Sequence, residues 1–291
     1  MIVVTGAAGF IAGHLVAELR ARGHTVVGID RRLGSDIVAD LVDDDRAHDV
    51  LRDADAVFHL AGAAGVRRNG GDAEAVWWRD NVVATEAVLV TVPAATPLVV
   101  ASSSSVYGGS RGAPCHEAQP LRPRGGYARS KLEVERCCQR RLARGGHAAI
   151  ARPFTVAGEG QRPDMALARW LDAARRGVPL RVFDSLDRRR DVTDVREVAR
   201  ALAEMARRQV TGAVNVGTGV SHTLADLVAA VIAVTGPAEV VVEPAGLEEV
   251  PATLADVGRC RRLLGFVPHT ELPLLVERQA TAAGLSVIGA A

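Results

Sequence analysis

The sequence predicts an α/β protein built on a doubly wound parallel sheet, with a smaller α/β lobe toward its C-terminal end. Three observations predict this fold class. Short β-branched runs alternate with stretches of helical length through the first half of the chain, which is the pattern of strands covered by helices on both faces. The first run ends in a glycine-rich turn that opens a helix. After about residue 155 the rhythm becomes irregular, with proline-rich loops and shorter elements.

The elements follow from these patterns in order. Continuous apolar runs predict strands at residues 2–6, 24–30, 56–62, 97–105 and 147–154. Helices are expected to begin near residues 9, 43, 72 and 127. Later strands, each after a helix of its own, are expected at 210–217 and 238–244. We therefore expect a nucleotide-binding domain over residues 1–155, with returning segments near 191–218, and a smaller lobe over residues 156–291.

The composition excludes several classes of protein. The net charge is +1, so there is no basic field for nucleic acid and no polybasic patch for a membrane surface. No apolar run reaches the length of about 18 residues that a membrane span needs, and the chain starts as a strand rather than as a signal peptide. The four cysteines form no CxxC pair, and the eight histidines lack the spacing of a metal site. We expect a cytoplasmic protein with no metal and with no nucleic-acid or membrane partner.

The loop "TGAAGFIAGHL" after the first strand predicts a dinucleotide site. Gly6 and Gly9 allow a tight turn and a close approach of the backbone to a ligand, and the helix that follows offers free N–H groups to a pyrophosphate. Asp30 ends the second strand 21 residues after Gly9, where a carboxylate suits a ribose 2′-hydroxyl and repels a 2′-phosphate. The following Arg31 and Arg32 could neutralise such a phosphate. NAD is favoured, with NADP as the alternative.

The chain contains a single lysine, Lys131. Lysine and arginine together number 35, so the other 34 basic side chains are arginines. Lys131 lies four positions after Tyr127, one of only two tyrosines. Residues four apart share one face of a helix, so the ammonium and the phenol are expected side by side. Because a compact ammonium and a planar guanidinium are not interchangeable, the lone lysine indicates a chemical role.

Six or more motifs in a fixed order carry a resemblance to a known family. The segments "TGAAGFIAGHL", "VFHLAG", "ASSSSVYG", "YARSK" and "RPFTVAGEGQRPDM" fall in the order and spacing of the extended short-chain dehydrogenase/reductases, the NAD-dependent nucleotide-sugar epimerase/dehydratase family. The resemblance continues through "RRRDVTDVREVARAL", "VNVGTG" and "ATLADVGRCRRLLGFVP" and covers nearly the whole chain. It looks most like the UDP-glucuronate and UDP-hexose 4-epimerase branch. The resemblance implies a Rossmann domain, a nucleotide-sugar-binding lobe and an enzyme.

The resemblance implies three catalytic residues. Tyr127 and Lys131 occupy the positions of the family's YxxxK motif, in which the tyrosine is the acid/base. Ser103, four positions before Tyr107, takes the place of the catalytic serine or threonine. Lowering the pKa of a tyrosine from about 10 to about 7 requires about 4 kcal/mol. We expect the Lys131 ammonium and the cofactor charge to supply it.

The resemblance also implies which residues bind NAD. Phe10 and Ile11 belong to the phosphate loop, and Asp40 and Leu41 border the adenine. The remaining expected contacts lie at the pyrophosphate, the ribose and the nicotinamide: Leu60, Ala61, Gly62, Asn81, Ser102 and Phe154, in addition to Gly6, Gly9, Asp30, Arg31, Tyr127 and Lys131. For Asn81 and Phe154 a purely structural role is an equal alternative.

On the substrate side the resemblance implies a nucleotide sugar linked to UDP or dTDP. Thr155 is expected at a sugar carboxylate or C6 group, and Arg190 at the diphosphate. The other expected contacts are Ser104, Val182, Phe183 and Glu249. The chain departs from the family's pattern at several positions. Ser104 and Ser105 replace the Asp-Glu pair of sugar dehydratases, which makes 4,6-dehydration improbable. Ala157 and Glu159 replace a Tyr and a Pro, and a second phosphate arginine falls on Ala245 or Gly246.

The sequence thus predicts an NAD-dependent nucleotide-sugar 4-epimerase that oxidises C4 and reduces it again on the other face. The alternative is an NADPH-dependent reductase of 4-keto sugars, for which Arg31 and Arg32 are the best support. Sugar-acid decarboxylation and a non-catalytic NAD-binding protein are more distant. The segments 72–92 and 127–145 match helices that pair across two-fold axes in relatives, so a homodimer is expected. Val76, Val83 and Val90 would supply one face, and Leu132 and Cys137 the other.

Overall fold

A seven-stranded parallel sheet forms the centre of the computed structural model, which describes residues 1–65, 72–244 and 250–287. The strand order is β11-β6-β5-β4-β1-β2-β3, and all six pairings are parallel. The strands are β1 (Ile2–Thr5), β2 (Val26–Asp30), β3 (Ile37–Val38), β4 (Ala56–His59), β5 (Leu98–Ala101), β6 (Ala149–Pro153) and β11 (Gly212–Val216). The chain starts at the centre, winds outward to β3 and then restarts at β4. The order therefore reverses between β1 and β4, where ligands of such sheets bind.

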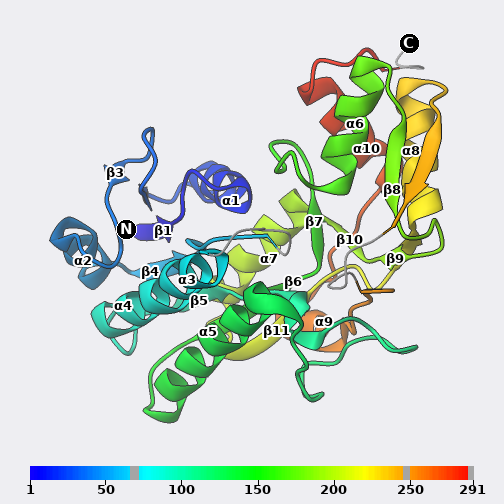
Figure 1. Ribbon diagram of the computed structural model, residues 1–291. Helices are drawn as coiled ribbons and strands as arrows, with labels where there is room; N and C mark the ends of the chain where they lie inside the picture. Colours follow the sequence, from blue (N-terminus) through cyan, green and yellow to red (C-terminus); the bar gives the residue numbers. More distant parts are fainter. Residues whose placement is uncertain (66–71, 245–249, 288–291) are drawn as a thin grey trace.

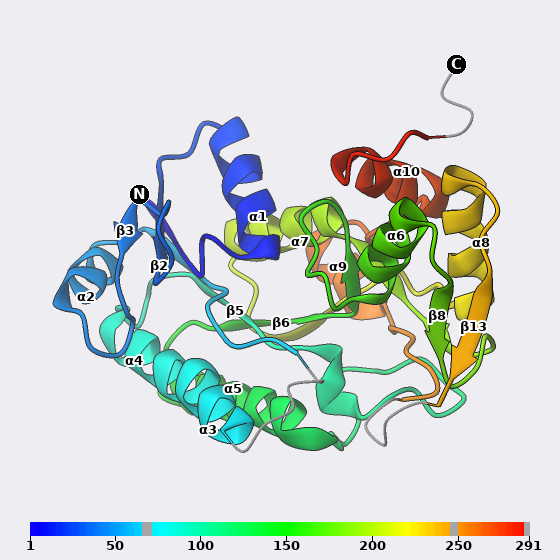
Figure 2. The same cartoon turned by 45° about the horizontal axis from the view of Figure 1, so that its top comes forward.

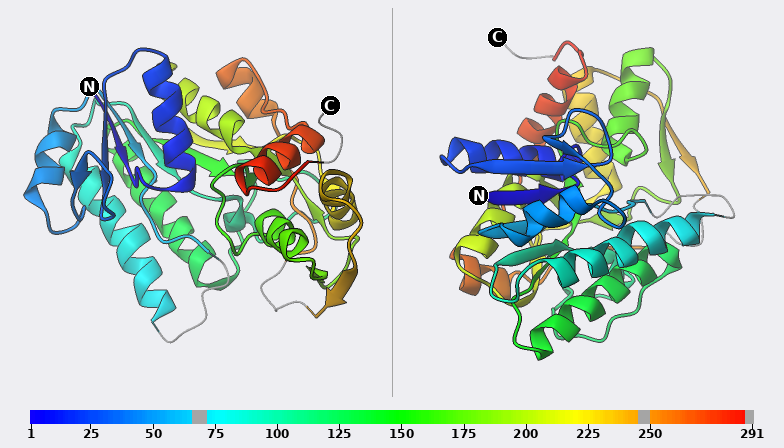
Figure 3. Two further views of the ribbon diagram at one scale, coloured as in Figure 1. Left: turned by 90° about the horizontal axis from the view of Figure 1, so that it is seen from above. Right: turned by 90° about the vertical axis from the view of Figure 1, so that its left-hand side faces the viewer.

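Helices cover both faces of this sheet (Figures 1 and 2). On one face, α1 (Phe10–Ala21), α7 (Val195–Arg207) and α9 (Gly258–Leu264) share a core with the strands. On the other face lie α2 (Asp45–Arg52), α4 (Ala84–Thr91) and α5 (Gly125–Ala143), which share a second core. The right-hand view of Figure 3 shows α1 on one side and the cyan and green helices on the other. This is the doubly wound architecture that the sequence predicts, and the fold class is confirmed.

The smaller lobe gathers beside the carboxyl ends of the strands and has a core of its own (Figure 3, left). Its helices are α6 (Ala166–Arg176), α8 (Leu224–Thr235) and α10 (Leu272–Ala282). Three two-stranded pairings complete it: β8 (Leu180–Phe183) with β13 (Val240–Glu243), β9 (Arg189–Arg190) with β12 (His222–Thr223), and β7 (Thr155–Ala157) with β10 (Val192–Asp194). The chain enters the lobe at β7 and returns through β10 to α7 and β11. A division into domains at residues 155 and 156 remains a proposal.

The predicted strands differ from the observed ones mainly at their carboxyl ends. The strand expected at 56–62 ends at His59, and the one expected at 97–105 ends at Ala101. Beyond these points the backbone leaves the sheet to line a cavity. Ser104–Tyr107 form a short 3-10 helix there. The described residues contain no helix that is long and apolar enough to cross a membrane.

The segment expected as one helix from residue 72 to residue 92 is interrupted. It consists of α3 (Ala73–Trp77), a π-helical turn η1 (Trp78–Val83) and α4. A π-turn inserts one extra residue into a helix and is common at functional sites. The sequence patterns do not distinguish it from an α-helix, because apolar periodicity changes little over one turn.

Candidate active site

A cavity of about 840 Å³ lies at the carboxyl ends of the parallel strands and reaches into the smaller lobe. It is large enough for a ligand of the size of a dinucleotide fragment or a drug. The predicted site residues that line it are Gly6, Gly9, Phe10, Ile11, Asp30, Arg31, Asp40, Leu41, Leu60, Ala61, Gly62, Ser102, Ser103, Ser104, Tyr127, Lys131, Phe154, Thr155, Phe183 and Arg190. Asn81 and Val182 are not among the lining residues. Glu249 lies outside the described residues, as do Ala245 and Gly246.

The glycine loop has the close backbone contacts that a phosphate site requires. Gly6 has a φ of +70°, and a Cβ there would lie 2.6 Å from the Ala61 nitrogen. Gly62, on the opposite strand end, would place a Cβ 2.5 Å from Asn81 Oδ1. Helix α1 begins directly after Gly9 without a side-chain cap. Its first amides are therefore free for an anionic group, and the loop fits the pyrophosphate of NAD.

Asp30 ends β2 with its carboxylate held in place by the backbone. Its Oδ2 accepts a hydrogen bond from the Ala8 amide at 3.1 Å, and its Oδ1 accepts one from the Arg32 amide at 2.9 Å. The Arg32 side chain pairs with the same carboxylate at 3.4 Å. An acceptor fixed at this edge of the cavity fits a ribose hydroxyl, which donates to it.

Asn81 lies behind the cavity wall rather than on it. Its side chain is fully buried, and its Nδ2 donates to Ser130 Oγ at 2.8 Å and to the Ala63 carbonyl at 3.2 Å. Its Oδ1, next to Gly62, has no hydrogen-bond partner among the described residues. Of the two roles that the sequence left open, this geometry favours the positioning of the Gly62–Ala63 backbone.

A buried histidine connects the same wall to the π-turn. Thr85 Oγ1 donates to the Asn81 carbonyl at 2.5 Å, so it must accept from His59 Nε2 at 3.0 Å. His59 Nδ1 then accepts from Thr5 Oγ1 at 2.8 Å, and Thr5 Oγ1 accepts from the Ala61 amide at 3.3 Å. Burial first, and then the Lys131 charge, lower the pKa of His59 to about 3. The ring is therefore neutral. Sequence reasoning missed this chain because its members are far apart in sequence.

The three predicted catalytic residues lie on one wall of the cavity. Ser103 follows β5 and caps the 3-10 helix, where its Oγ accepts from the Ser105 amide at 3.1 Å. Tyr127 and Lys131 lie one turn apart at the start of α5. Lys131 Nζ donates to the Ala101 carbonyl at 2.9 Å. The arrangement joins a hydroxyl, a phenol and an ammonium, which can move a proton to and from a substrate hydroxyl.

The electrostatics of this wall differ from the expectation in one respect. Burial raises the pKa of Tyr127, while a hydrogen bond from Ser103 and the charge of Arg162 act to lower it. Burial lowers the pKa of Lys131 to about 8. Lys131, which was expected to lower the pKa of Tyr127 together with the cofactor charge, is not among the groups that shift this pKa here. Arg162 is the guanidinium whose charge acts on the phenol.

Arg162 enters the site from the segment between β7 and α6. It pairs with Asp164 at 2.6 Å and lines the cavity together with it. One of its nitrogens lies 3.3 Å from the position that a Cβ on Gly65 would occupy. The guanidinium of the smaller lobe thus covers backbone of the first half next to the catalytic wall. The sequence showed this arginine within "GQRPDM", but the pattern alone did not indicate that it reaches Tyr127.

A buried ion pair supports the catalytic helix from behind. Arg152 of β6 donates to both carboxylate oxygens of Glu135 in α5, at 2.8 and 2.6 Å. Ser102 Oγ donates to the same carboxylate at 2.5 Å, so its hydroxyl is directed away from the cavity. Arg152 also donates to the Tyr107 hydroxyl at 2.7 Å. Glu135 lies one turn after Lys131, and the pair therefore fixes the rotation of α5.

The lobe side of the cavity carries aromatic and cationic side chains. Phe183 lies beneath the Arg169 guanidinium at 4.8 Å, and both line the cavity together with Arg190. Val182 was expected here as part of the segment that flanks the nucleobase, but it is not among the residues that line the cavity. It is fully buried in the lobe core, because alternate residues of a strand face opposite sides. Arg181 and Phe183 take the cavity face of β8 instead, and sequence reasoning missed Arg169 and Arg181.

The described residues contain no cluster of metal-ligating side chains. The side chains that line the cavity around Tyr127 and on the lobe side include hydroxyls, an ammonium and guanidinium groups. These groups suit an anionic ligand with a reactive hydroxyl.

Comparison with known proteins is consistent with this site. Residues 2–217 match the family model described as the NAD dependent epimerase/dehydratase family. A Bacillus subtilis protein named "Uncharacterized UDP-glucose epimerase YtcB" is 30% identical over 93% of this chain and 94% of its own length. The solved structure of MoeE5 in complex with UDP-glucuronic acid and NAD has a TM-score of 0.88 and 36% identity, covering 97% of this chain and 98% of MoeE5. That of UDP-glucuronic acid 4-epimerase from Bacillus cereus, with UDP-glucuronic acid and NAD, has a TM-score of 0.89 and 28% identity, covering 97% and 98% of the two chains.

Proposed function

Because the chain belongs to the NAD dependent epimerase/dehydratase family, we propose that it is an NAD-dependent 4-epimerase of a UDP-sugar, with UDP-glucuronate as the first candidate substrate. The observation that carries the proposal is the wall formed by Ser103, Tyr127 and Lys131 in a cavity that runs from the glycine loop to the smaller lobe. The similarity to MoeE5 and to the Bacillus cereus 4-epimerase, both solved with UDP-glucuronic acid and NAD, supports it.

The residues of the chain divide the work of the reaction. In its phenolate form the Tyr127 oxygen takes the proton of the C4 hydroxyl, and the phenol so formed returns this proton to the product. Ser103 shares this hydrogen bond and holds the hydroxyl against Tyr127. Lys131 and Asp30 bind ribose hydroxyls, and the amides after Gly9 bind the pyrophosphate. NAD, when bound, supplies a two-electron acceptor at C4 that later gives the same two electrons back. The proton and the electron pair removed from the substrate are both restored, so cofactor and protein end unchanged.

The chemistry of the lobe side favours a sugar acid. Thr155 and Arg162 line the same cavity as Ser103 and Tyr127, and the charge of Arg162 acts on the Tyr127 phenol. Asp164 already accepts from Arg162 Nε and Nη2, at 2.8 and 2.6 Å. A sugar carboxylate would therefore bind to the remaining Nη1 and to the Thr155 hydroxyl, through charge-assisted hydrogen bonds. A neutral CH₂OH group at C6 would offer Arg162 no charge to pair with. We therefore rank UDP-glucuronate before UDP-glucose.

The experiment that tests the proposal is turnover without added cofactor. Purified protein is incubated with UDP-glucuronate, and the two C4 epimers are separated by chromatography. We expect interconversion to an equilibrium mixture, with no net change in the absorbance of reduced nicotinamide. In deuterated water C4 should stay unlabelled, because its hydrogen never exchanges with solvent.

The competing activity gives an opposite result in the same assay. A 4-keto-sugar reductase would oxidise added NADPH in proportion to the ketone consumed and would epimerise no UDP- or dTDP-sugar. Such an outcome would replace the 4-epimerase by the reductase. UDP-glucose is tested in parallel. Epimerisation of UDP-glucose without epimerisation of UDP-glucuronate would change the proposed sugar and leave the proposed reaction unchanged.

We further propose a homodimer that forms through α3, η1 and α4 together with α5. Val90 of α4 is 88% exposed and Trp78 of η1 is 53% exposed, which leaves apolar side chains on this face for a second copy to cover. Cys137 was expected on the same face, but it is buried within the chain, and its Sγ lies 3.6 Å from Glu86 Oε1. It therefore cannot supply the interface.

A further inference from the structure

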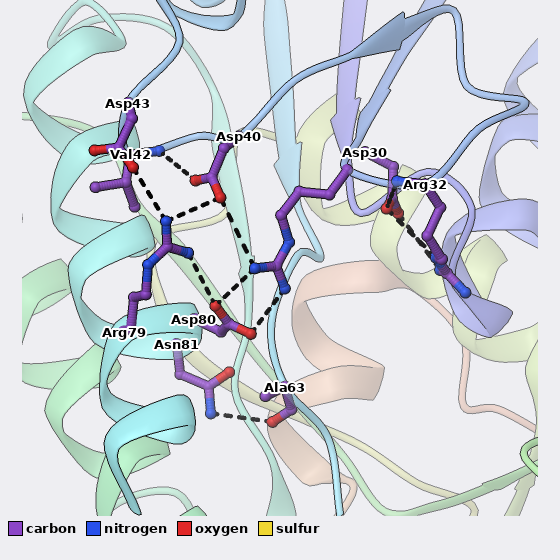
Figure 4. A network of polar contacts seen from close by, with 10 residues as sticks. Asp30, Arg32, Asp40, Val42, Asp43, Ala63, Arg79, Asp80 and Asn81 are labelled. Atoms are coloured by element: carbon purple, nitrogen blue, oxygen red, sulfur yellow. Dashed lines mark hydrogen bonds and ion pairs between the residues drawn. The ribbon is translucent and has the colours of Figure 1, made fainter. Parts of the chain in front are cut away.

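The rim at the adenosine end of the cavity holds its arginines in ion pairs (Figure 4). Arg31 Nη1 lies 3.1 Å from Asp80 Oδ1, and Arg31 Nη2 lies 2.8 Å from Asp80 Oδ2. Both nitrogens of one edge of the guanidinium thus bind both oxygens of one carboxylate. This two-bonded geometry is the strongest form of an arginine–carboxylate pair.

A second carboxylate and a second arginine fix this pair in place. Asp40 lies 3.8 Å from Arg31. Arg79 connects Asp40, at 3.0 Å, to Asp80, at 3.3 Å. The Asp80 side chain is only 11% exposed, whereas that of Arg31 is 56% exposed. Asp80 of the π-turn is therefore the fixed partner, and it holds the more exposed Arg31 in position.

The charges of this rim disfavour an added phosphate. Among the described residues, three arginines and four aspartates meet here: Arg31, Arg32, Arg79, Asp30, Asp40, Asp43 and Asp80. One negative charge is in excess. A phosphate monoester adds a charge of about −1.5 to −2 near neutral pH. It would need a guanidinium that is free to turn toward it, and Arg32 already lies against the Asp30 carboxylate at 3.4 Å.

We propose that Asp80 is a specificity-determining residue that excludes NADP by holding Arg31 away from the position of a 2′-phosphate. The inference rests on the proposed use of NAD and assigns a role to a residue outside the glycine loop and the β2 terminus. Asp30 repels the phosphate directly. Asp80 acts on Arg31, which could otherwise neutralise the phosphate. The two arginines Arg31 and Arg32 in the sequence therefore no longer favour NADP.

Two single variants separate this mechanism from a general effect of charge. Asp80→Asn removes the charge of the holding carboxylate with little change of volume and frees Arg31. Asp43→Asn is the matched control, because it removes the same charge from the same rim. Asp43 is 72% exposed and pairs with Arg79 at 3.1 Å. Asp80→Ala serves as a second variant, since an asparagine can keep one hydrogen bond to Arg31.

A double variant tests whether the effect passes through Arg31. Asp80→Asn combined with Arg31→Gln lacks the freed guanidinium, so any gain in NADP binding should disappear. Arg31→Gln alone should leave the ratio of bound NADP to bound NAD nearly unchanged, because Arg31 is already held away from the 2′ position.

The measurement is the ratio of bound NADP to bound NAD. Each full-length variant is dialysed against an excess of both dinucleotides at equal concentration, separated from free nucleotide and analysed by chromatography. We expect the ratio to rise about tenfold or more in Asp80→Asn and Asp80→Ala, as for a hydrogen bond to a charged group. It should stay within about twofold of the wild-type ratio in Asp43→Asn and in the double variant. Asp30 keeps NAD preferred throughout.

Two outcomes would overturn the inference. An unchanged ratio in both Asp80 variants would mean that Asp80 does not hold Arg31 away from a 2′-phosphate. An equal rise in Asp43→Asn would mean that the total charge of the rim, and not the Arg31–Asp80 pair, determines the ratio. The proposed function fails differently, because wild-type protein that binds neither dinucleotide would contradict the use of NAD itself.

Discussion

At the residue scale, Lys131 is the position at which size and charge together limit substitution. Its side chain is buried, and its ammonium donates to the Ala101 carbonyl at 2.9 Å. A guanidinium there would need more volume and could not make the same compact contact. We expect Lys131→Arg to lower kcat by at least about tenfold while the protein stays folded. An unchanged rate and pH profile would remove the chemical role of the only lysine, and Tyr127→Phe should lose more activity still.

The buried His59 predicts how stability depends on pH. The folded-state pKa of His59 is lowered to about 3 from its ordinary value of 6.5, so the unfolded chain binds a proton that the folded chain does not. The contribution of His59 to the free energy of unfolding is therefore fully present above about pH 7. It is lost as the pH falls from 6.5 toward 3. From pH 7 to pH 5 this group alone should lower the free energy of unfolding by about 2 kcal/mol.

Urea unfolding at the two pH values measures this effect. His59→Gln removes the titrating group and keeps a donor and an acceptor for Thr85 and Thr5. Between pH 7 and pH 5 the free energy of unfolding of this variant should fall by about 2 kcal/mol less than that of the wild type. Parallel pH curves for the two proteins would mean that His59 does not titrate as its burial requires.

At the element scale, the Glu135–Arg152 pair determines how α5 lies on β6. Both side chains are almost fully buried, so removing one partner leaves a buried charge without compensation. We expect Arg152→Met to lower the free energy of unfolding by about 3–5 kcal/mol, measured by denaturant titration. Combining it with Glu135→Leu should recover part of this loss, because two apolar side chains replace the pair. A double variant that loses more free energy of unfolding than the two single variants lose together would contradict this account.

The elements also show what the sequence could and could not predict. Strands such as β1 and β5 were predicted because continuous β-branched runs are visible without knowledge of their neighbours. The π-turn before α4 was not, since apolar periodicity changes little over one turn. The side-chain direction of Val182 could not be predicted, because the face of a short strand depends on the side on which the core lies. The three residues of the catalytic wall were expected from their positions in the family's motifs, and in the structure all three line the cavity.

At the scale of the whole molecule, the apolar face around α4 and η1 predicts an assembly. We expect a homodimer at concentrations of about 10 µM and above in sedimentation velocity, because interfaces of this kind are buried between two copies. Val90→Asp places a charge at a side chain that is 88% exposed in the single chain, so it should leave folding intact and shift the protein toward monomer. A wild-type protein that sediments only as monomer would exclude the dimer.

The position of Tyr107 gives the protein an optical property. Its hydroxyl accepts from Arg152 and donates to Asn215 at 2.6 Å, and burial raises its pKa. Only one other tyrosine exists in the chain, and that is Tyr127, which lines the cavity. The ultraviolet absorbance that appears when a phenol ionises should therefore come from a single residue in the folded protein. A spectrophotometric titration would follow the acid/base candidate itself, without a label and without a substrate.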